Sequence, residues 1–145
     1  MTFSDSFLGR VADYLGAKTS AALGLTGGSL TFNKIAAGSN SDYAHGVART
    51  VNLRFNAAGE RYTEVVIHEL GHIIDYQAGR AMGLAGEAWA TDKNYLWNLA
   101  HNNKTGNVAD ANNNAREDFA NTFVSEVQHH NGYQGFRPLG RLMPF

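Results

Sequence analysis

The 145-residue sequence contains no cysteine. Its absence excludes disulfide bonds, cysteine nucleophiles and thiolate metal sites. Any metal ion would therefore have to be held by histidine, aspartate or glutamate side chains, together with water. A chain without cysteine suits any redox compartment, and it can be threaded through a translocation pore without breaking disulfides.

The sequence also lacks an excess of charge of either sign. It has 12 lysine and arginine residues against 13 aspartate and glutamate residues. Because no global field attracts an anionic polymer or an anionic membrane surface, we expect no nucleic-acid partner. A nucleic-acid role would need a local basic stripe, and none is visible along the sequence.

Long apolar runs are missing as well. No stretch of about 18 apolar residues suggests a membrane span. The N-terminal segment MTFSDSFLGRVADYLG carries Asp5, Arg10 and Asp13 where a secretory signal peptide would have an apolar core. We therefore expect a soluble chain without a signal peptide, either cytoplasmic or exported by a non-classical route. Its length suits a single domain over residues 1–145.

The spacing of apolar residues predicts an α+β domain. Periodicity at helical spacing predicts helices over residues 4–15, 60–79, 89–101 and 115–129. Alternation predicts strands over residues 29–35 and 48–56, joined by a loop at 36–46. In the second strand Val51 and Leu53 face one way, while Asn52 and Arg54 face solvent or a groove. Asn114 is a suitable N-cap for the last helix.

The segment VVIHELGHIIDY, residues 65–76, carries two histidines four apart, with a glutamate directly after the first. Side chains four residues apart on a helix lie about 5–6 Å from each other, so His68 and His72 can hold one ion. Glu69 lies about 100° round the helix from His68, so it cannot be a third ligand on that face. It can instead accept a proton from a water on the open side of the metal. The order His-Glu-x-x-His is typical of zinc hydrolases.

The alternative interpretation is an amphipathic helix that carries two histidines by chance. Both flanks of the motif are apolar, with Val65, Val66 and Ile67 before it and Ile73 and Ile74 after it. Such a helix is expected to be buried, and buried histidines without partners would be costly, whereas metal binding removes that cost. The glycine at position 71 lowers helix propensity by about 1 kcal/mol, which indicates close backbone packing.

The third ligand has to come from a later segment, because Ala78 stands where the extended motif has a histidine. The predicted helix REDFANTFVSEV, residues 116–127, has carboxylates beside an apolar stripe. We expect Glu117 to be the ligand and Asn121, one turn later, to orient a ligating histidine. Alternatives for the third ligand are Asp118, Glu126 and Asp110.

Neighbouring Glu117 and Asp118 point about 100° apart, so only one of them can face the metal. Glu117 lies beside the stripe of Phe119 and Phe123, whereas Asp118 shares a face with Thr122 that we interpret as the solvent side. The alternative interpretation is that Glu117 is exposed and that its carboxylate only stabilises the N-terminus of the helix.

The segments HELGHIIDYQAG and EDFANTF together resemble gluzincin metallopeptidases of the anthrax lethal factor type. The resemblance implies a zincin-like fold, in which a small mixed sheet packs on the active-site helix. It also implies that His68, His72 and Glu117 bind zinc and that Glu69 is the catalytic base. Asn121 occupies a position that is acidic in lethal factor.

The same family uses a tyrosine shortly before the third ligand to stabilise the oxyanion, and residues 102–116 contain none. Our first choice for that role is Tyr133. The alternatives are His129, His130, Tyr95 and His45. In zincins an edge strand lines the cleft and binds extended substrate. The segment TVNLRF, residues 50–55, is one candidate for that strand; otherwise it is an ordinary sheet strand.

The motif and the resemblance predict a zinc-dependent endopeptidase, a zinc metallopeptidase that hydrolyses peptide bonds through a metal-activated water. We expect Zn²⁺ as the cofactor and a monomer that acts on a protein or peptide substrate. The effector domain of a translocated bacterial toxin is one setting that fits. The alternative is a catalytically inactive zincin-fold binding module with a structural zinc. Glu69 discriminates between them, because a structural site needs no acid beside its first ligand.

Overall fold

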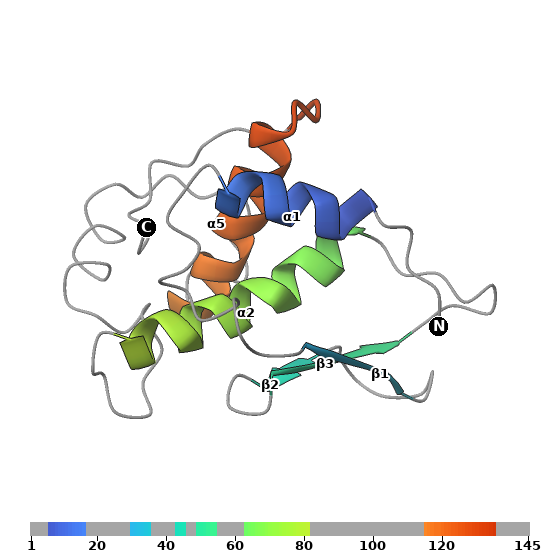
Figure 1. Cartoon of the computed structure of the whole chain (residues 1–145), viewed down its shortest axis with the longest axis vertical. Coiled ribbons are helices and arrows are strands. Elements are labelled where there is room, and N and C mark those ends of the chain that lie inside the picture. Colours follow the sequence, from blue (N-terminus) through green and yellow to red (C-terminus); the bar gives the residue numbers. More distant parts are fainter. Residues whose placement is uncertain are drawn as a thin grey trace.

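The computed structural model describes residues 6–16, 30–35, 43–45, 49–54, 63–81 and 115–135. In these segments a small sheet lies on one side of α2 (Thr63–Ala81), and α1 (Ser6–Gly16) lies on the other side (Figure 1). The helix α5 (Ala115–His130) crosses α2. The predicted α+β class is confirmed. Among the described helices, none combines the length and the apolar character that a membrane crossing requires.

The sheet has three described strands, β1 (Thr31–Ile35), β2 (Tyr43–His45) and β3 (Thr50–Arg54), in the order β1-β3-β2. β3 is parallel to β1 and antiparallel to β2. Of the two interpretations of residues 50–55, the cleft-edge strand is therefore contradicted and the ordinary sheet strand holds, because β3 pairs on both sides. β2 lies in the segment that was expected to be a loop, residues 36–46. The sequence does not reveal this strand, because three residues are too few to show alternation.

The central position of β3 explains which of its residues are buried. Val51 and Leu53 are fully buried in the hydrophobic core, as the alternation predicts. Asn52 faces the opposite way but is only 6% exposed. Its Oδ1 accepts a hydrogen bond of 3.0 Å from Nδ2 of Asn33 on β1. Asn52 is thus buried and paired rather than directed to solvent.

The helix α1 matches its predicted range closely and packs on α5. Val11 and Tyr14 belong to the core. The ring of Tyr14 meets Phe123 edge to face, with centroids 5.8 Å apart. Burial, reinforced by the negative charge of Glu126, raises the pKa of the Tyr14 phenol. Tyr14 therefore stays protonated and acts as a core side chain.

The helix α2 is buried around most of its circumference because it lies between the sheet and the other helices. Its buried apolar side chains are Val66, Ile67, Leu70, Ile73 and Ile74. Gly71 lies at a close approach to α5, where a Cβ atom would be 3.1 Å from the Cα of Ala120 and 3.3 Å from the Cβ of Phe123. The predicted close backbone packing at Gly71 is confirmed.

The helix α5 also matches its predicted range, and it is followed by a tight turn. Gly132 adopts a positive φ of 76°, which glycine tolerates and which ends the helix. The amide of Tyr133 donates to the carbonyl of Gln128 at 3.0 Å within this turn. The predicted helix over 89–101 and the N-cap at Asn114 lie outside the described residues.

Candidate metal centre

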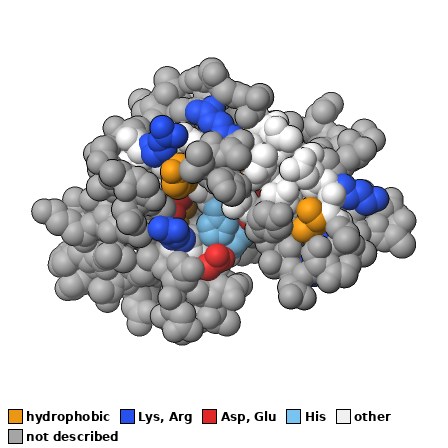
Figure 2. Space-filling view, turned by 90° about the horizontal axis from the view of Figure 1, so that it is seen from below, with side chains coloured by type: hydrophobic (Ala, Val, Ile, Leu, Met, Phe, Trp, Pro, Cys, Tyr) orange, Lys and Arg blue, Asp and Glu red, His pale blue; other side chains and the backbone are white. Residues whose placement is uncertain are grey.

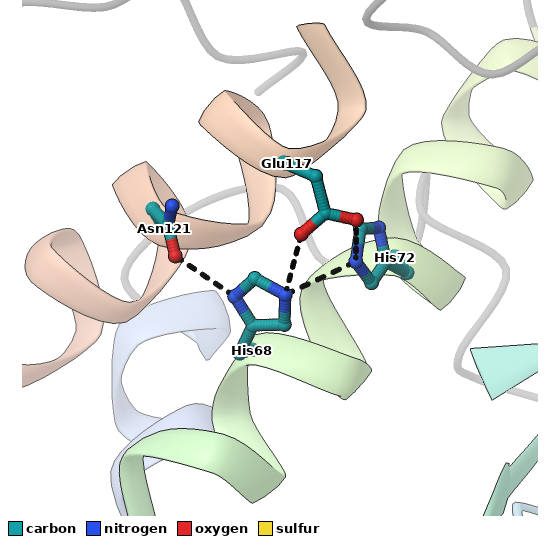
Figure 3. A network of polar contacts seen from close by, with 4 residues as sticks. All are labelled: His68, His72, Glu117 and Asn121. Carbon is teal, nitrogen blue, oxygen red and sulfur yellow. Dashed lines mark hydrogen bonds and ion pairs between the residues drawn. The ribbon is translucent and has the colours of Figure 1, made fainter. Parts of the chain in front are cut away.

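The crossing of α2 and α5 brings His68, His72 and Glu117 together (Figure 3). One ligand atom from each lies within 4.8 Å of the others. Glu117 turns one oxygen to each histidine, with Oε2 3.1 Å from Nε2 of His68 and Oε1 3.2 Å from Nε2 of His72. The two Nε2 atoms are 3.1 Å apart. The sequence-predicted ligand set therefore converges at one point.

The donor atoms of this triad fit a zinc ion. Zinc–nitrogen bonds of about 2.0–2.1 Å at tetrahedral angles place neighbouring ligand atoms about 3.3–3.4 Å apart. The observed separations of 3.1 to 3.2 Å fall short of that spacing only slightly. Two imidazoles and one carboxylate are a known donor set of catalytic zinc sites, which keep a fourth position open. The triad can thus hold a metal ion with little rearrangement.

Asn121 contacts the ring nitrogen of His68 that points away from the triad (Figure 3). Its Oδ1 lies 2.9 Å from Nδ1 of His68. Because an amide oxygen can only accept, Nδ1 carries the proton, and Nε2 holds the lone pair when His68 is neutral. This tautomer presents Nε2 to a metal ion. Nδ2 of Asn121 has no hydrogen-bond partner among the described residues.

The charges at the triad favour an ionised carboxylate. Hydrogen bonds from His68 and His72, reinforced by the charges of both rings, hold the pKa of Glu117 well below its ordinary 4.5. Burial disfavours the protonated form of His68. The hydrogen bond to Glu117 and the charges of Glu69 and Glu117 outweigh burial and raise the pKa of His68 above 6.5. A carboxylate that stays ionised is what a metal ligand requires.

Glu69, the predicted general base, follows His68 on α2 and is 6% exposed. Its charge contributes to the raised pKa of His68, which places its carboxylate within electrostatic reach of the triad. Its catalytic role stays a prediction.

The triad can be reached from outside the protein. The side chains of His68, His72 and Glu117 keep 18%, 20% and 34% of their surface exposed. Figure 2 looks at the molecule from the side of the sheet and shows a histidine surface in a hollow, with a carboxylate at its border. A ligand could therefore approach a metal ion held here.

A second group of polar contacts joins α1, α2 and α5. Gln128 is almost fully buried, and its side-chain amide nitrogen, Nε2, donates to Oε1 of Glu64 at 3.4 Å. Nη1 of Arg10 on α1 donates to Oε1 of Gln128 at the same distance. The sequence did not lead us to predict these contacts. The one sequence feature that points to them is the four-residue spacing of Glu64 and His68, which puts both side chains on one face of α2.

Asp118, the first alternative for the third ligand, is not part of the triad. Asp118 is 2% exposed and Thr122 is fully buried, so the prediction that this face of α5 is the solvent side is wrong. The physical reason is that α5 is an interior helix, which packs on both α1 and α2. Glu126 lies more than two turns beyond the triad, and Asp110 lies outside the described residues.

Tyr133 follows the opposite end of α5, roughly 20 Å from Glu117 at the helical rise per residue. The guanidinium of Arg10 lies over its ring, with Cζ 3.8 Å from the centroid. Tyr133 is therefore not part of this site, and its assignment as the oxyanion donor is wrong.

The other candidates for the oxyanion donor are not at the triad either, where the structure describes them. His129 and His130 share the far end of α5, and the ring of His130 packs against Tyr14. Tyr95 lies outside the described residues, as does the side chain of His45 in β2.

Comparisons with protein-family models, with curated proteins and with solved structures find no match for this chain. The resemblance to gluzincins therefore stays a prediction that rests on the two segments and on the geometry of the triad.

Proposed function

We propose that this chain is a zinc-dependent endopeptidase with a zincin-like fold that hydrolyses peptide bonds. The observation that carries the proposal is the convergence of His68, His72 and Glu117, from two helices far apart in the sequence, within 4.8 Å. The Asn121 contact at 2.9 Å supports it, because this contact directs Nε2 of His68 to the triad. A protein site with three ligands leaves a fourth position for water or substrate.

Each residue has a defined task in this proposal. A bound zinc ion would supply a Lewis acid that polarises the scissile carbonyl and lowers the pKa of water. His68 and His72 hold the ion as neutral imidazoles, and the ionised Glu117 contributes the negative charge. The carboxylate of Glu69 accepts a proton from the attacking water. It then delivers that proton to the leaving amine.

An extended substrate would pair with an edge of the sheet. Since β3 is central, the edges among the described strands are β1 and β2. Of these two, β2 packs more extensively against α2, the helix that carries the histidines. We therefore assign substrate pairing to β2 in this proposal.

The alternative function is an inactive binding module with a structural zinc. Structural zinc sites are usually closed by four protein ligands, whereas the described triad supplies three. Glu69 beside the first ligand also favours hydrolysis. Delivery as a toxin effector stays a prediction.

Metal analysis combined with an unbiased peptide-library digest tests the proposal. We expect one zinc per chain and cleavage that a chelator abolishes and added zinc restores. Zinc without cleavage of any library member would favour the binding module. Absence of a bound metal, or a metal bound away from His68 and His72, would contradict both functions.

A further inference from the structure

We propose that Asn131 is a site of spontaneous deamidation and that its conversion to aspartate or isoaspartate loosens α1 from α5. This site is separate from the metal centre and does not depend on the proposed peptidase activity. It lies at the far end of α5, where the turn that follows the helix meets α1 (Figure 1). Both the local sequence and the contacts at this point support the proposal.

The pair Asn131–Gly132 is the single place in the sequence where glycine follows asparagine. Because glycine has no Cβ atom, its backbone nitrogen can approach the side-chain carbonyl carbon of the asparagine. The nitrogen of Gly132 then bonds to Cγ of Asn131, the bond from Cγ to Nδ2 breaks, and ammonia leaves with the amide proton. Water opens the resulting cyclic imide to aspartate or isoaspartate. Water is the only reactant that these two residues do not supply.

The fold holds both reacting groups in hydrogen bonds. Nδ2 of Asn131 donates to the carbonyl oxygen of Val127 at 2.8 Å and to that of Arg10 at 3.0 Å. The backbone nitrogen of Gly132 donates to the carbonyl oxygen of His129 at 2.9 Å. The imide can therefore form only when this turn opens and Asn131 separates from α1. Because Gly132 is exposed and Asn131 is half-buried, such an opening does not require the core to unfold.

The side-chain amide of Asn131 links α1 to α5, because one nitrogen donates to a carbonyl of each helix. Two further contacts join Arg10 to the same end of α5. Its Nη1 donates to Oε1 of Gln128 at 3.4 Å, and its Cζ lies 3.8 Å from the centroid of the Tyr133 ring. Arg10 and Asn131 therefore supply these polar attachments of α1 to the end of α5.

Deamidation replaces the donor at this contact with an acceptor. An ionised carboxylate can only accept hydrogen bonds, so it would face the carbonyl oxygens of Val127 and Arg10 with no proton to share. Its negative charge would also lie at the C-terminal end of α5, where the helix dipole disfavours it. Isoaspartate adds a methylene group to the backbone and displaces the turn as well. A molecule that is modified while it is open therefore closes less tightly.

Peptide mapping of the full chain after incubation in mildly alkaline, oxygen-labelled water tests the chemistry. We expect a mixture of aspartate and isoaspartate at position 131 that carries labelled oxygen from the solvent. Asn121, which precedes the β-branched Thr122, is the internal control and should keep its amide. The reaction at Asn131 should be faster in urea than in buffer, because unfolding frees both reacting groups. An intact amide at Asn131 in urea, conversion of Asn121 at the same rate, or equal rates at Asn131 in urea and in buffer would overturn the proposal.

Hydrogen exchange of the Asn131→Asp variant tests the effect on α1. We expect the backbone amides of α1 to exchange at least about fivefold faster than in the wild type, because two hydrogen bonds are lost. Amides of β3, which lies across α2 from α1, should keep their wild-type rates. Unchanged exchange in α1, or equal acceleration in β3, would overturn the proposal.

Two further variants separate the lost hydrogen bonds from the added charge. Gln134→Glu is the matched control, because it replaces an exposed amide with a carboxylate in the same turn. It should leave the exchange of α1 unchanged, and acceleration equal to that of Asn131→Asp would overturn the proposal. Asn131→Ala removes the donor without adding charge, so it keeps the test open if Asn131→Asp does not fold. Wild-type exchange of α1 in Asn131→Ala would also overturn the proposal.

Discussion

Glu69 is the residue whose substitution separates catalysis from metal binding. Glu69→Gln keeps the shape of the side chain but removes its ability to accept a proton. We expect the variant to retain zinc and its fold and to lose peptidase activity by at least about 100-fold. Metal analysis and kcat measure the two effects. Glu64→Gln, at an exposed glutamate five residues earlier on α2, is the control. Zinc loss in Glu69→Gln would instead make Glu69 a ligand.

Glu117 and Asp118 are adjacent and chemically alike, but the structure gives them different surroundings. Glu117→Ala removes a ligand and should weaken zinc binding by more than the roughly 10–100-fold typical of supporting residues. Asp118→Ala removes a buried carboxylate and should cost about 1–3 kcal/mol of unfolding free energy while zinc still binds. Chelator competition and denaturant titration measure these effects. A folded Asp118→Ala variant without zinc would reverse the assignment.

Asn121 should control the orientation of His68 through the 2.9 Å contact to Nδ1. Asn121→Leu should weaken zinc binding roughly 10–100-fold, whereas Asn121→Asp keeps the acceptor and should retain zinc. Nitrogen-detected NMR of the His68 ring should show loss of the Nδ1–H tautomer only in the leucine variant. Thr122→Val is the control, since the buried hydroxyl of Thr122 has no partner among the described residues. Wild-type affinity in Asn121→Leu would refute the role.

At the scale of elements, the spacing between α2 and α5 sets the geometry of the triad. Gly71→Ala gains helix propensity of up to about 1 kcal/mol, but its new methyl group meets the backbone of Ala120. Overpacking of this kind costs about 1–3 kcal/mol, so we expect a less stable protein with weaker zinc binding. Thermal unfolding and chelator competition measure both.

Gly9→Ala is the matched control for this element-scale prediction. Gly9 lies on the exposed side of α1, and a Cβ atom there meets nothing within 4 Å among its surroundings. The substitution should therefore stabilise the protein by up to about 1 kcal/mol. A stabilised Gly71→Ala variant with wild-type zinc affinity would show that the two helices do not need this close approach.

At the scale of the whole molecule, stability should depend on pH in opposite ways with and without zinc. The pKa of His68 is raised, so its contribution is full below about pH 6.5 and is lost as the pH rises through the folded-state value. The pKa of Glu117 is lowered, so its contribution is present above about pH 4.5 and is lost as the pH falls. The metal-free protein should therefore lose stability as the pH rises above about 6.5.

Zinc should reverse this trend, because the ion binds the deprotonated ring and its affinity rises with pH. Denaturant titrations between about pH 5.5 and pH 8, with and without zinc, measure both trends. His68→Gln is the control. In this variant the pH dependence of stability should differ less between the metal-free and the zinc-containing protein. A wild-type protein whose metal-free stability rises as steeply as its zinc-bound stability would contradict the role of the His68–Glu117 pair.

The sequence by itself determined the features that depend on near neighbours along the chain. The four-residue spacing of His68 and His72 and the ranges of α1 and α5 arise from local helical geometry. The absence of cysteine likewise determined which donors a metal site can use. These predictions succeed because a helix places residues three and four apart on one face, whatever the rest of the fold does.

Only the tertiary structure decided which faces of these elements are covered. The burial of Asp118 depends on the packing of α5 inside the protein, and the central position of β3 depends on partners on both sides. The separation of Tyr133 from the triad depends on the direction in which α5 crosses α2. Each of these results from contacts between segments far apart in the chain, and local periodicity carries no information about such contacts.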